Sequence, residues 1–190
     1  MTGVILAGGK NSRIGMKKAF IEIGGKTIID NILNIFKDIF TEVLIVTNTP
    51  QDFYYTKVNI IRDILPGYGS LGGLYTGVKK AKYDKCFVVA CDMPFINSNL
   101  IKYMLGIEGY DVVVPKIKGR FEPLFAVYSK GCLEVIEKNL YKGNLKISEI
   151  YSEMRLREIN EDEFDLFDSG LLSIININTP SDLKNILAQS

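Results

Sequence analysis

The feature that most constrains the fold is an alternation of short, uninterrupted apolar runs with segments of helical periodicity. The runs at 3–7, 42–47 and 85–92 lack in-and-out alternation, so both faces of each predicted strand should be covered. Between them, segment 27–40 has apolar residues at helical spacing. We therefore predict a three-layer α/β domain with a mostly parallel central sheet. Further strands are predicted over 57–63, 111–115, 122–129 and 173–177, further helices over 69–81, 97–106, 131–143 and 179–189, and a partly helical surface loop over 160–170.

Composition narrows the classes of function. The 190 residues predict a single domain over 1–190, and a net charge of +1 gives no overall field that would attract nucleic acid or an anionic membrane. The chain has no histidine, which excludes His-based metal sites, Ser-His-Asp triads and imidazole acid–base catalysis. Three cysteines fit no zinc or disulfide spacing and favour a reducing, cytoplasmic location. We expect no signal peptide and no membrane span.

The first predicted strand leads into a glycine-rich, basic loop, AGGKNSRIGMKKA, at residues 7–19. Glycines let main-chain N–H groups approach an anion, and Lys10, Ser12, Arg13 and Lys18 can add donors and positive charge. The spacing matches neither GxxxxGK[ST] nor GxGxxG. The alternative is an ordinary strand-to-helix connection whose lysines are simply solvated.

Two further strand ends carry polar side chains. Thr47 and Asn48 close the second apolar strand, where either could bind a ligand, although a turn is the favoured interpretation. Asp63 brings a carboxylate to the end of the third strand. The glycine-rich segment 67–73 that follows could pack flat against a purine, or could allow tight packing beneath the next helix.

A second strand-end carboxylate, Asp92, ends the fourth apolar strand. A carboxylate there must be solvated, hydrogen-bonded or bound to a cation. Mg²⁺ takes one or two protein carboxylates together with phosphates and water, whereas the alternative role is a cap for the next helix or turn. Ligands of open parallel sheets bind outside the carboxyl ends of the strands. The basic glycine loop and Asp92 together therefore predict a site for a nucleoside triphosphate with Mg²⁺.

Five motifs in the chain resemble those of the nucleotidyltransferases. LAGGKNSRIGMKKA at 6–19 is similar to the signature LAGGxSxRMGxxK, GSLGGLYTG at 69–77 to GPLxGI, and CDMPF at 91–95 to CDxPF. RFEPLFAVY at 120–128 and ININTPSDL at 175–183 resemble elements of one branch, the molybdenum cofactor guanylyltransferases. The motifs occur in the right order and span the chain, which makes the combination specific.

This resemblance implies a Rossmann-like nucleotidyltransferase fold and a defined reaction. The terminal phosphate of metal-loaded molybdopterin would attack the α-phosphorus of GTP, with release of pyrophosphate and formation of the guanine dinucleotide cofactor. It also implies Lys18, Arg13 and Asp92 as the catalytic group, with Asp92 binding Mg²⁺, and delivery proteins and acceptor molybdoenzymes as partners. The implied nucleotide-binding positions are Leu6, Ala7, Gly8, Gly9, Ser12, Lys18, Thr47, Asp63, Gly72 and Asp92, and the implied pterin-side positions are Glu122, Asn176 and Asn178.

The chain departs from the family pattern at two positions. Lys17 stands where the family usually has aspartate, and Ser70 replaces a proline. The residues by themselves support Mg²⁺-dependent nucleotide chemistry, but they do not select guanine over cytosine. A cytidylyltransferase acting on molybdopterin or another small phosphate, and a non-catalytic nucleotide-binding module, therefore stand as alternatives. A nucleic-acid binder is disfavoured by the neutral charge and by the lack of a basic stripe.

Overall fold

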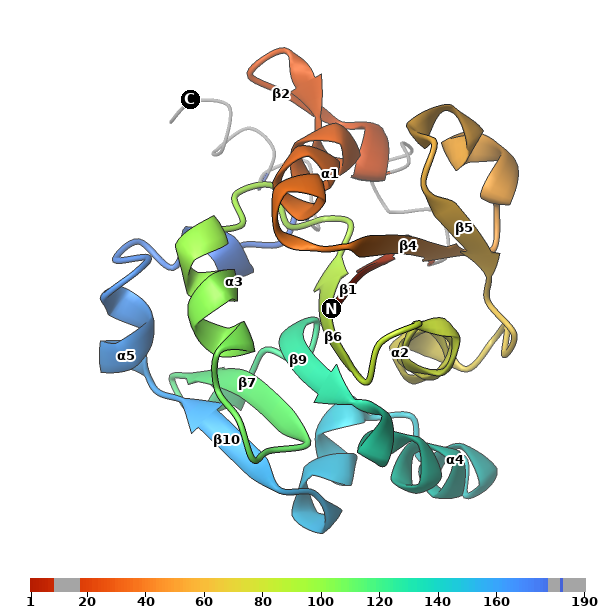
Figure 1. Cartoon of the computed structure of the whole chain (residues 1–190), viewed down its shortest axis with the longest axis vertical. Coiled ribbons are helices and arrows are strands. Elements are labelled where there is room, and N and C mark those ends of the chain that lie inside the picture. Colours follow the sequence, from red (N-terminus) through yellow and green to blue (C-terminus); the bar gives the residue numbers. More distant parts are fainter. Residues whose placement is uncertain (9–17, 178–181, 183–190) are drawn as a thin grey trace.

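The computed structural model describes residues 1–8, 18–177 and 182, and in this part of the chain an eight-stranded sheet forms the centre of the molecule (Figure 1). Its strand order is β10-β7-β9-β6-β1-β4-β5, with β8 paired to β7. The bounds are β1 Thr2–Leu6, β4 Glu42–Thr47, β5 Asn59–Arg62, β6 Lys85–Ala90, β7 Val112–Ile117, β8 Arg120–Phe121, β9 Phe125–Ser129 and β10 Leu156–Ile159. A separate hairpin pairs β2 Glu22–Ile23 with β3 Lys26–Thr27.

The strand directions confirm the predicted, mostly parallel sheet. β1 runs parallel to β4 and to β6, β4 runs parallel to β5, and β10 runs parallel to β7. β9 is antiparallel to both of its neighbours, β6 and β7. The carboxyl ends of β6, β1, β4 and β5 therefore share one edge with the amino end of β9.

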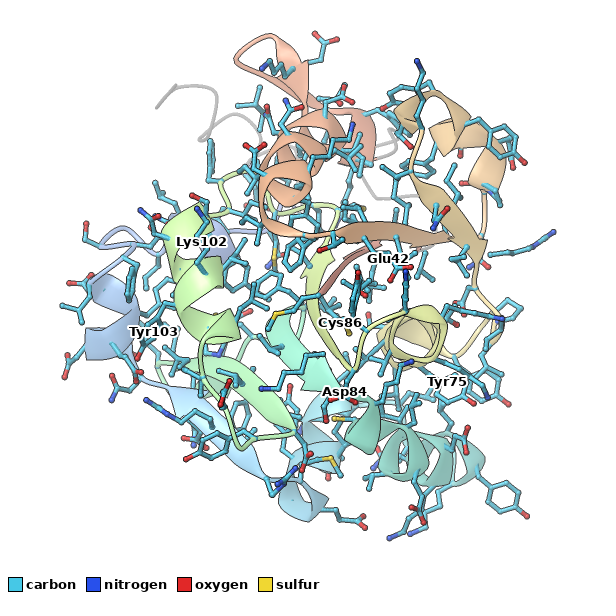
Figure 2. The ribbon with its side chains drawn as sticks, in the orientation of Figure 1. Glu42, Tyr75, Asp84, Cys86, Lys102 and Tyr103 are labelled. Atoms are coloured by element: carbon cyan, nitrogen blue, oxygen red, sulfur yellow. The ribbon has the colours of Figure 1, made fainter. Side chains whose placement is uncertain are left out.

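Helices cover both faces of this sheet, which completes the three layers (Figure 1). One face packs against α1, α3 and α5, and the other against α2 and α4. In Figure 2, Tyr103 on α3 and Tyr75 on α2 mark these two sides. The helix bounds are α1 Ile28–Ile39, α2 Gly69–Lys80, α3 Ser98–Leu105, α4 Leu133–Tyr141 and α5 Glu161–Asp165, and the 3-10 helices are η1 Lys18–Phe20, η2 Pro50–Thr56, η3 Lys130–Cys132, η4 Ile147–Glu153 and η5 Leu172–Ile174.

The uninterrupted apolar runs of the sequence follow from this double coverage. Within β1, Ile5 packs on the α1 side of the sheet, whereas Val4 and Leu6 pack on the α2 side. α2 approaches very closely, since a Cβ at Gly77 would lie 2.6 Å from Val4 Cγ1. A strand covered on both faces therefore favours apolar side chains at successive positions.

The C-terminal part of the described chain differs from the prediction at 173–177. This segment was predicted as a strand, but it forms the short helix η5 followed by irregular backbone. The cause is local, because the Asp168 carboxylate accepts hydrogen bonds from the backbone N–H groups of Leu172 and Ser173 and holds a turn there. Ile177 is still fully buried. The helix predicted over 179–189 lies outside the described residues, apart from Asp182.

The edge strand β10 was not predicted. It is aligned by an ion pair in which Arg155 donates to both carboxylate oxygens of Asp111, at 2.9 and 2.8 Å. This bonding holds the pKa of Asp111 down at about 2.

Segment 160–170 contains the predicted helical part, α5, but the buried ring of Phe164 makes it part of the core as well as of the surface. No helix among the described residues has the length and apolarity needed to cross a membrane.

Four phenylalanines form the aromatic centre of the α1 side. Phe87 on β6 lies 4.9 Å from Phe125, 6.1 Å from Phe36 and 6.3 Å from Phe40, measured between ring centroids. All four rings are buried. Phe87 therefore joins two strands to α1, and its removal would leave a cavity at the middle of the sheet.

We expect Phe87→Ala to lower the free energy of unfolding by about 3–5 kcal/mol, because lost apolar burial and the resulting cavity both act. Tyr141→Ala is the control, since Tyr141 is 95% exposed at the end of α4 and its loss should change stability by less than about 0.5 kcal/mol. Urea titrations followed by circular dichroism measure both values. Equal effects of the two substitutions would contradict this account of the core.

Candidate functional site

Polar groups line the edge of the sheet at which β6, β1, β4 and β5 end. Asp92 follows β6, Gly8 follows β1, Asn48 follows β4 and Asp63 follows β5. Neighbouring strands lie about 4.8 Å apart, so this row extends over roughly 14 Å. It is a row of acceptors and main-chain groups long enough to accommodate an extended ligand across four strands.

Backbone hydrogen bonds continue past the strand ends and hold the row in register. Cys91 N–H donates to the Leu6 carbonyl at 3.1 Å, and Ala7 N–H donates to the Val46 carbonyl at 2.8 Å. Asp63 N–H likewise donates to the Thr47 carbonyl at 3.1 Å. The residues that the sequence placed after separate strands are therefore fixed relative to one another.

Lys18 and Asp92, 74 positions apart in the chain, form an ion pair at one end of the row. Lys18 Nζ donates to Asp92 Oδ2 at 2.7 Å, and the two side chains are only 22% and 16% exposed. The helix-cap alternative for Asp92 is wrong, because Asn97 caps α3 by accepting from the N–H groups of Asn99 and Leu100. The structure thus joins the end of the basic loop to the strand-end carboxylate.

The Thr47 hydroxyl is engaged within the protein. It donates to the Ala7 carbonyl at 3.0 Å, accepts from Thr49 N–H at 3.1 Å, and is fully buried. This is the turn that the sequence favoured, and a nucleotide contact by Thr47 stays a prediction. Asn48 is exposed and lies beside Gly8, since a Cβ at Gly8 would stand 3.9 Å from Asn48 Nδ2. Asn48 is therefore the better placed of the two side chains to contact a ligand.

Asp63 and Gly72 lie together at the far end of the row. Asp63 Oδ1 accepts from the Thr76 hydroxyl at 2.8 Å and from Leu65 N–H at 3.0 Å. A Cβ at Gly72 would lie 2.8 Å from the Leu65 carbonyl oxygen. The glycine is therefore required for tight packing of the loop on α2, which was one of the two interpretations of this segment.

Two of the implied pterin-side residues, Glu122 and Asn176, lie at the same edge of the sheet as Asp92, beyond the end of the row. Because β9 is antiparallel to β6, Glu122 before β9 lies at the same edge, and Ala90 N–H donates to the Leu124 carbonyl at 3.0 Å. Ile177 N–H donates to the Asp92 carbonyl at 3.0 Å, which brings Asn176 to this edge as well. Asp92 thus stands between the row of polar groups and a second polar region.

Burial raises the pKa of the Glu122 carboxyl group, although Arg120 acts in the opposite direction. The side chain is half-buried. A partly desolvated carboxylate costs folding energy at neutral pH, so its presence here fits a role in binding better than a role in stability.

Four of the predicted site positions, Gly9, Ser12, Arg13 and Asn178, lie outside the described residues. The candidate donor Lys10 and the atypical Lys17 also lie outside them. One residue that the sequence did not single out is Thr76. The signal for it was present, because Thr76 is the one Ser or Thr among the buried residues of α2, which are otherwise glycine, aliphatic residues and Tyr75.

A divalent metal fits the chemistry of the Asp92 end. Among the described residues no three Cys, Asp or Glu side chains cluster as a metal cage. Mg²⁺ needs no such cage, because it binds one or two carboxylates and takes its other ligands from phosphates and water. The half-buried Asp92 carboxylate at a strand end is a donor of this kind.

Comparison with known proteins agrees with this geometry. Residues 3–158 match the model of the MobA-like NTP transferase domain. The chain is 41% identical over 187 residues to the molybdenum cofactor guanylyltransferase of Desulfosudis oleivorans, covering 97% of this chain and 93% of the relative. It is 39% identical over 183 residues to the probable molybdenum cofactor guanylyltransferase of Pelotomaculum thermopropionicum, covering 96% and 89%.

The chain belongs to the molybdenum cofactor guanylyltransferase family.

A solved structure agrees in both fold and family. Molybdopterin-guanine dinucleotide biosynthesis protein A from Archaeoglobus fulgidus superposes with a TM-score of 0.86 at 27% identity, covering 100% of this chain and 98% of the other. The family predicted from the five motifs and the Rossmann-like three-layer fold are therefore both confirmed.

We expect Glu122→Gln to raise the melting temperature at pH 7, because it removes a charge that burial disfavours. The folded-state pKa of Glu122 lies above its ordinary value of 4.5, so the folded state binds this proton more tightly than the unfolded chain does, and the ionised form opposes folding at higher pH. The gap between variant and parent should close as the pH falls to 4.5 and below. Differential scanning fluorimetry across pH measures it, with Glu108→Gln at an exposed loop position as the control. A lower melting temperature for Glu122→Gln at pH 7 would show that the charge is stabilising.

Proposed function

We propose that this protein transfers GMP from GTP to the terminal phosphate of molybdopterin, releasing pyrophosphate and forming the guanine dinucleotide cofactor. The observation that carries the proposal is the row of polar groups at the ends of β6, β1, β4 and β5, in a member of this family. The nucleotide would lie along the row. The acceptor would lie on the Glu122 and Asn176 side, so that the two substrates meet at Asp92.

The chemistry requires one bond to form and one to break at the α-phosphorus. An oxygen of the acceptor phosphate attacks, the bond from the α-phosphorus to the bridging oxygen of the β-phosphate breaks, and pyrophosphate leaves with the electron pair. Such transfers depend chiefly on positioning and charge stabilisation, which fits a chain without histidine. Lys18 would neutralise phosphate charge, and the main chain at Leu6, Ala7 and Gly8 would orient the nucleotide. Asp92 would hold Mg²⁺, which when bound would neutralise charge on the phosphates.

The Lys18–Asp92 ion pair has a physical consequence for binding. Before ligands arrive, each charge is balanced by the other at 2.7 Å. When the nucleotide and the metal bind together, Lys18 gains the phosphates and Asp92 gains the cation, so both charges keep a partner. Binding of the nucleotide without the metal would draw Lys18 away from Asp92 and leave that largely buried carboxylate without a cation, which is costly. Binding of GTP and of Mg²⁺ should therefore be mutually dependent.

Several further parts of the proposal follow from the same family. Proteins that deliver molybdopterin, and the molybdoenzymes that accept the product, would be its partners. A reducing cytoplasm suits the three cysteines, which are all free thiols, with Cys86 and Cys132 buried.

One assay separates the proposal from its alternatives. Purified protein is given molybdate-loaded molybdopterin, Mg²⁺ and each nucleoside triphosphate in turn, and pyrophosphate release is followed. We expect pyrophosphate release with GTP and with none of the other nucleoside triphosphates. Release with CTP in preference to GTP would favour the cytidylyltransferase, and nucleotide binding without release under any condition would favour the non-catalytic module.

We expect Lys18→Ala to lower kcat by about 10²–10³-fold, since a donor to charge that develops in the transition state is lost. The control is Lys102→Ala, because Lys102 is an exposed lysine on α3, which follows the strand end without contributing to the row (Lys102 is labelled in Figure 2). Pyrophosphate release at saturating substrates measures both variants. Unchanged kcat for Lys18→Ala would remove Lys18 from the catalytic group.

We also expect that the dissociation constant of GTP falls by about tenfold or more when Mg²⁺ is added to the parent protein, and changes far less with Asp92→Asn. Isothermal titration calorimetry with and without Mg²⁺ measures this difference independently of turnover. An equal response to Mg²⁺ in both proteins would show that Asp92 is not the metal ligand.

A further inference from the structure

We propose that Thr76, on the buried face of α2, is a positioning residue for nucleotide binding. Its hydroxyl fixes the Asp63 carboxylate so that this group accepts a hydrogen bond from the nucleoside part of the nucleotide. The inference rests on the proposed function. It adds the role of Thr76 and identifies the part of the nucleotide that Asp63 would contact.

The Thr76 hydroxyl is used twice, once as a donor and once as an acceptor. It donates to Asp63 Oδ1 at 2.8 Å and accepts from Ile64 N–H at 3.2 Å, while Thr76 itself is fully buried. Leu65 N–H supplies a second donor to the same Oδ1 at 3.0 Å. The carboxylate therefore has one oxygen held by two donors, and it cannot rotate without losing both bonds.

The other oxygen of Asp63 is the one left for a ligand. A carboxylate offers about four acceptor positions over its two oxygens. In the described parts of the chain, both side-chain hydrogen bonds to Asp63 go to Oδ1 and none goes to Oδ2. Asp63 is only half-buried, so the group is accessible from the edge of the sheet.

Thr76 is a rigid support because α2 is locked onto the sheet. Its neighbours Leu74 and Val78 are fully buried, and at Gly77 a Cβ would already meet Val4 at 2.6 Å. The helix therefore has no room to move toward the sheet. A β-branched side chain in a helix is also restricted to few χ1 rotamers. The hydroxyl is thus fixed relative to β1 and to the row.

The place of Asp63 in the row selects the part of the ligand that it meets. It stands at β5, three strands from Asp92 and therefore roughly 14 Å from the end where the phosphates would bind. A carboxylate close to a triphosphate would be repelled, whereas at this distance it can accept from N–H or O–H groups. Guanine N–H groups and ribose hydroxyls are donors of this chemistry.

The test compares Thr76→Val, which keeps shape but removes the hydroxyl, with Thr76→Ser, which restores it. The matched control is Thr2→Val at the opposite edge of the sheet. Thr2 is also fully buried, and its hydroxyl also donates to a carboxylate, Glu42 Oε2, at 2.7 Å. Glu42 is labelled in Figure 2, at the start of β4. Each protein is titrated with GTP and Mg²⁺ by calorimetry, and its melting temperature is measured.

We expect Thr76→Val to raise the dissociation constant of GTP by about tenfold, as for loss of a hydrogen bond to a charged group, with kcat at saturating GTP little changed. Thr76→Ser should bind nearly as the parent does. Thr2→Val should lose melting temperature but bind GTP as the parent does. Asp63→Asn should weaken binding, and adding Thr76→Val to it should have little further effect, because the two residues act through one contact.

Analogues show which donor Asp63 meets. If the contact is to the guanine amino group, inosine triphosphate should bind parent and Thr76→Val equally weakly. If the contact is to a ribose hydroxyl, the parent and Thr76→Val should instead bind 2′- or 3′-deoxy-GTP equally weakly. Should Thr76→Val fail to fold, Thr76→Ala takes its place in the same comparison.

Two results would overturn the inference. One is parent-like GTP affinity in Thr76→Val, and the other is an equal loss of affinity in Thr2→Val, which would make the effect one of general stability. Failure of the parent protein itself to bind GTP is a different outcome, which removes the proposed function and the inference with it.

Discussion

The parallel pairing of β1 with β4 on one side and β6 on the other is the constraint on which the remainder of the structure depends. Parallel strands end at the same edge, and their crossover helices must lie on the faces of the sheet. β1 is therefore buried on both faces, and its chain emerges between two other strand ends. The residues that follow these parallel strands are therefore brought together at the shared carboxyl edge of the sheet.

A single reversal of strand direction gives the site its two sides. If β9 ran parallel to β6, it would begin at the opposite edge of the sheet, and Glu122, which precedes it, would lie there too. As an antiparallel strand it begins where β6 ends, and the Leu124 carbonyl is bonded to Ala90. The hydrogen bond from Ile177 to Asp92 then brings the C-terminal part of the described chain to the same place. One carboxylate thereby borders both regions.

Among the described residues, the charged groups of the site are stabilised in different ways. Lys18 balances Asp92, and the Asp63 carboxylate is held by neutral donors from α2 and its own loop. Glu122 differs, because burial opposes its charge. A site of this kind acts through fixed dipoles and charges, which suits a transfer reaction between two anionic phosphates more than it suits proton transfer.

The sequence by itself determined the family, the layer architecture and the strand ends that matter. The continuous apolar runs predicted strands covered on both faces. Asp63 and Asp92 could be placed at strand ends because a charged residue ends each of these runs. It did not yield β10, whose formation depends on the distant ion pair between Arg155 and Asp111. It also wrongly predicted a strand at 173–177, where Asp168 instead holds a turn at the start of a partly buried segment. Only the tertiary structure decided that the Thr47 hydroxyl is turned inward, that Lys18 meets Asp92 across 74 positions, and that Thr76 supports Asp63. Periodicity reports which residues are buried, whereas these pairings depend on which strands become neighbours, and that is set by packing of the whole chain.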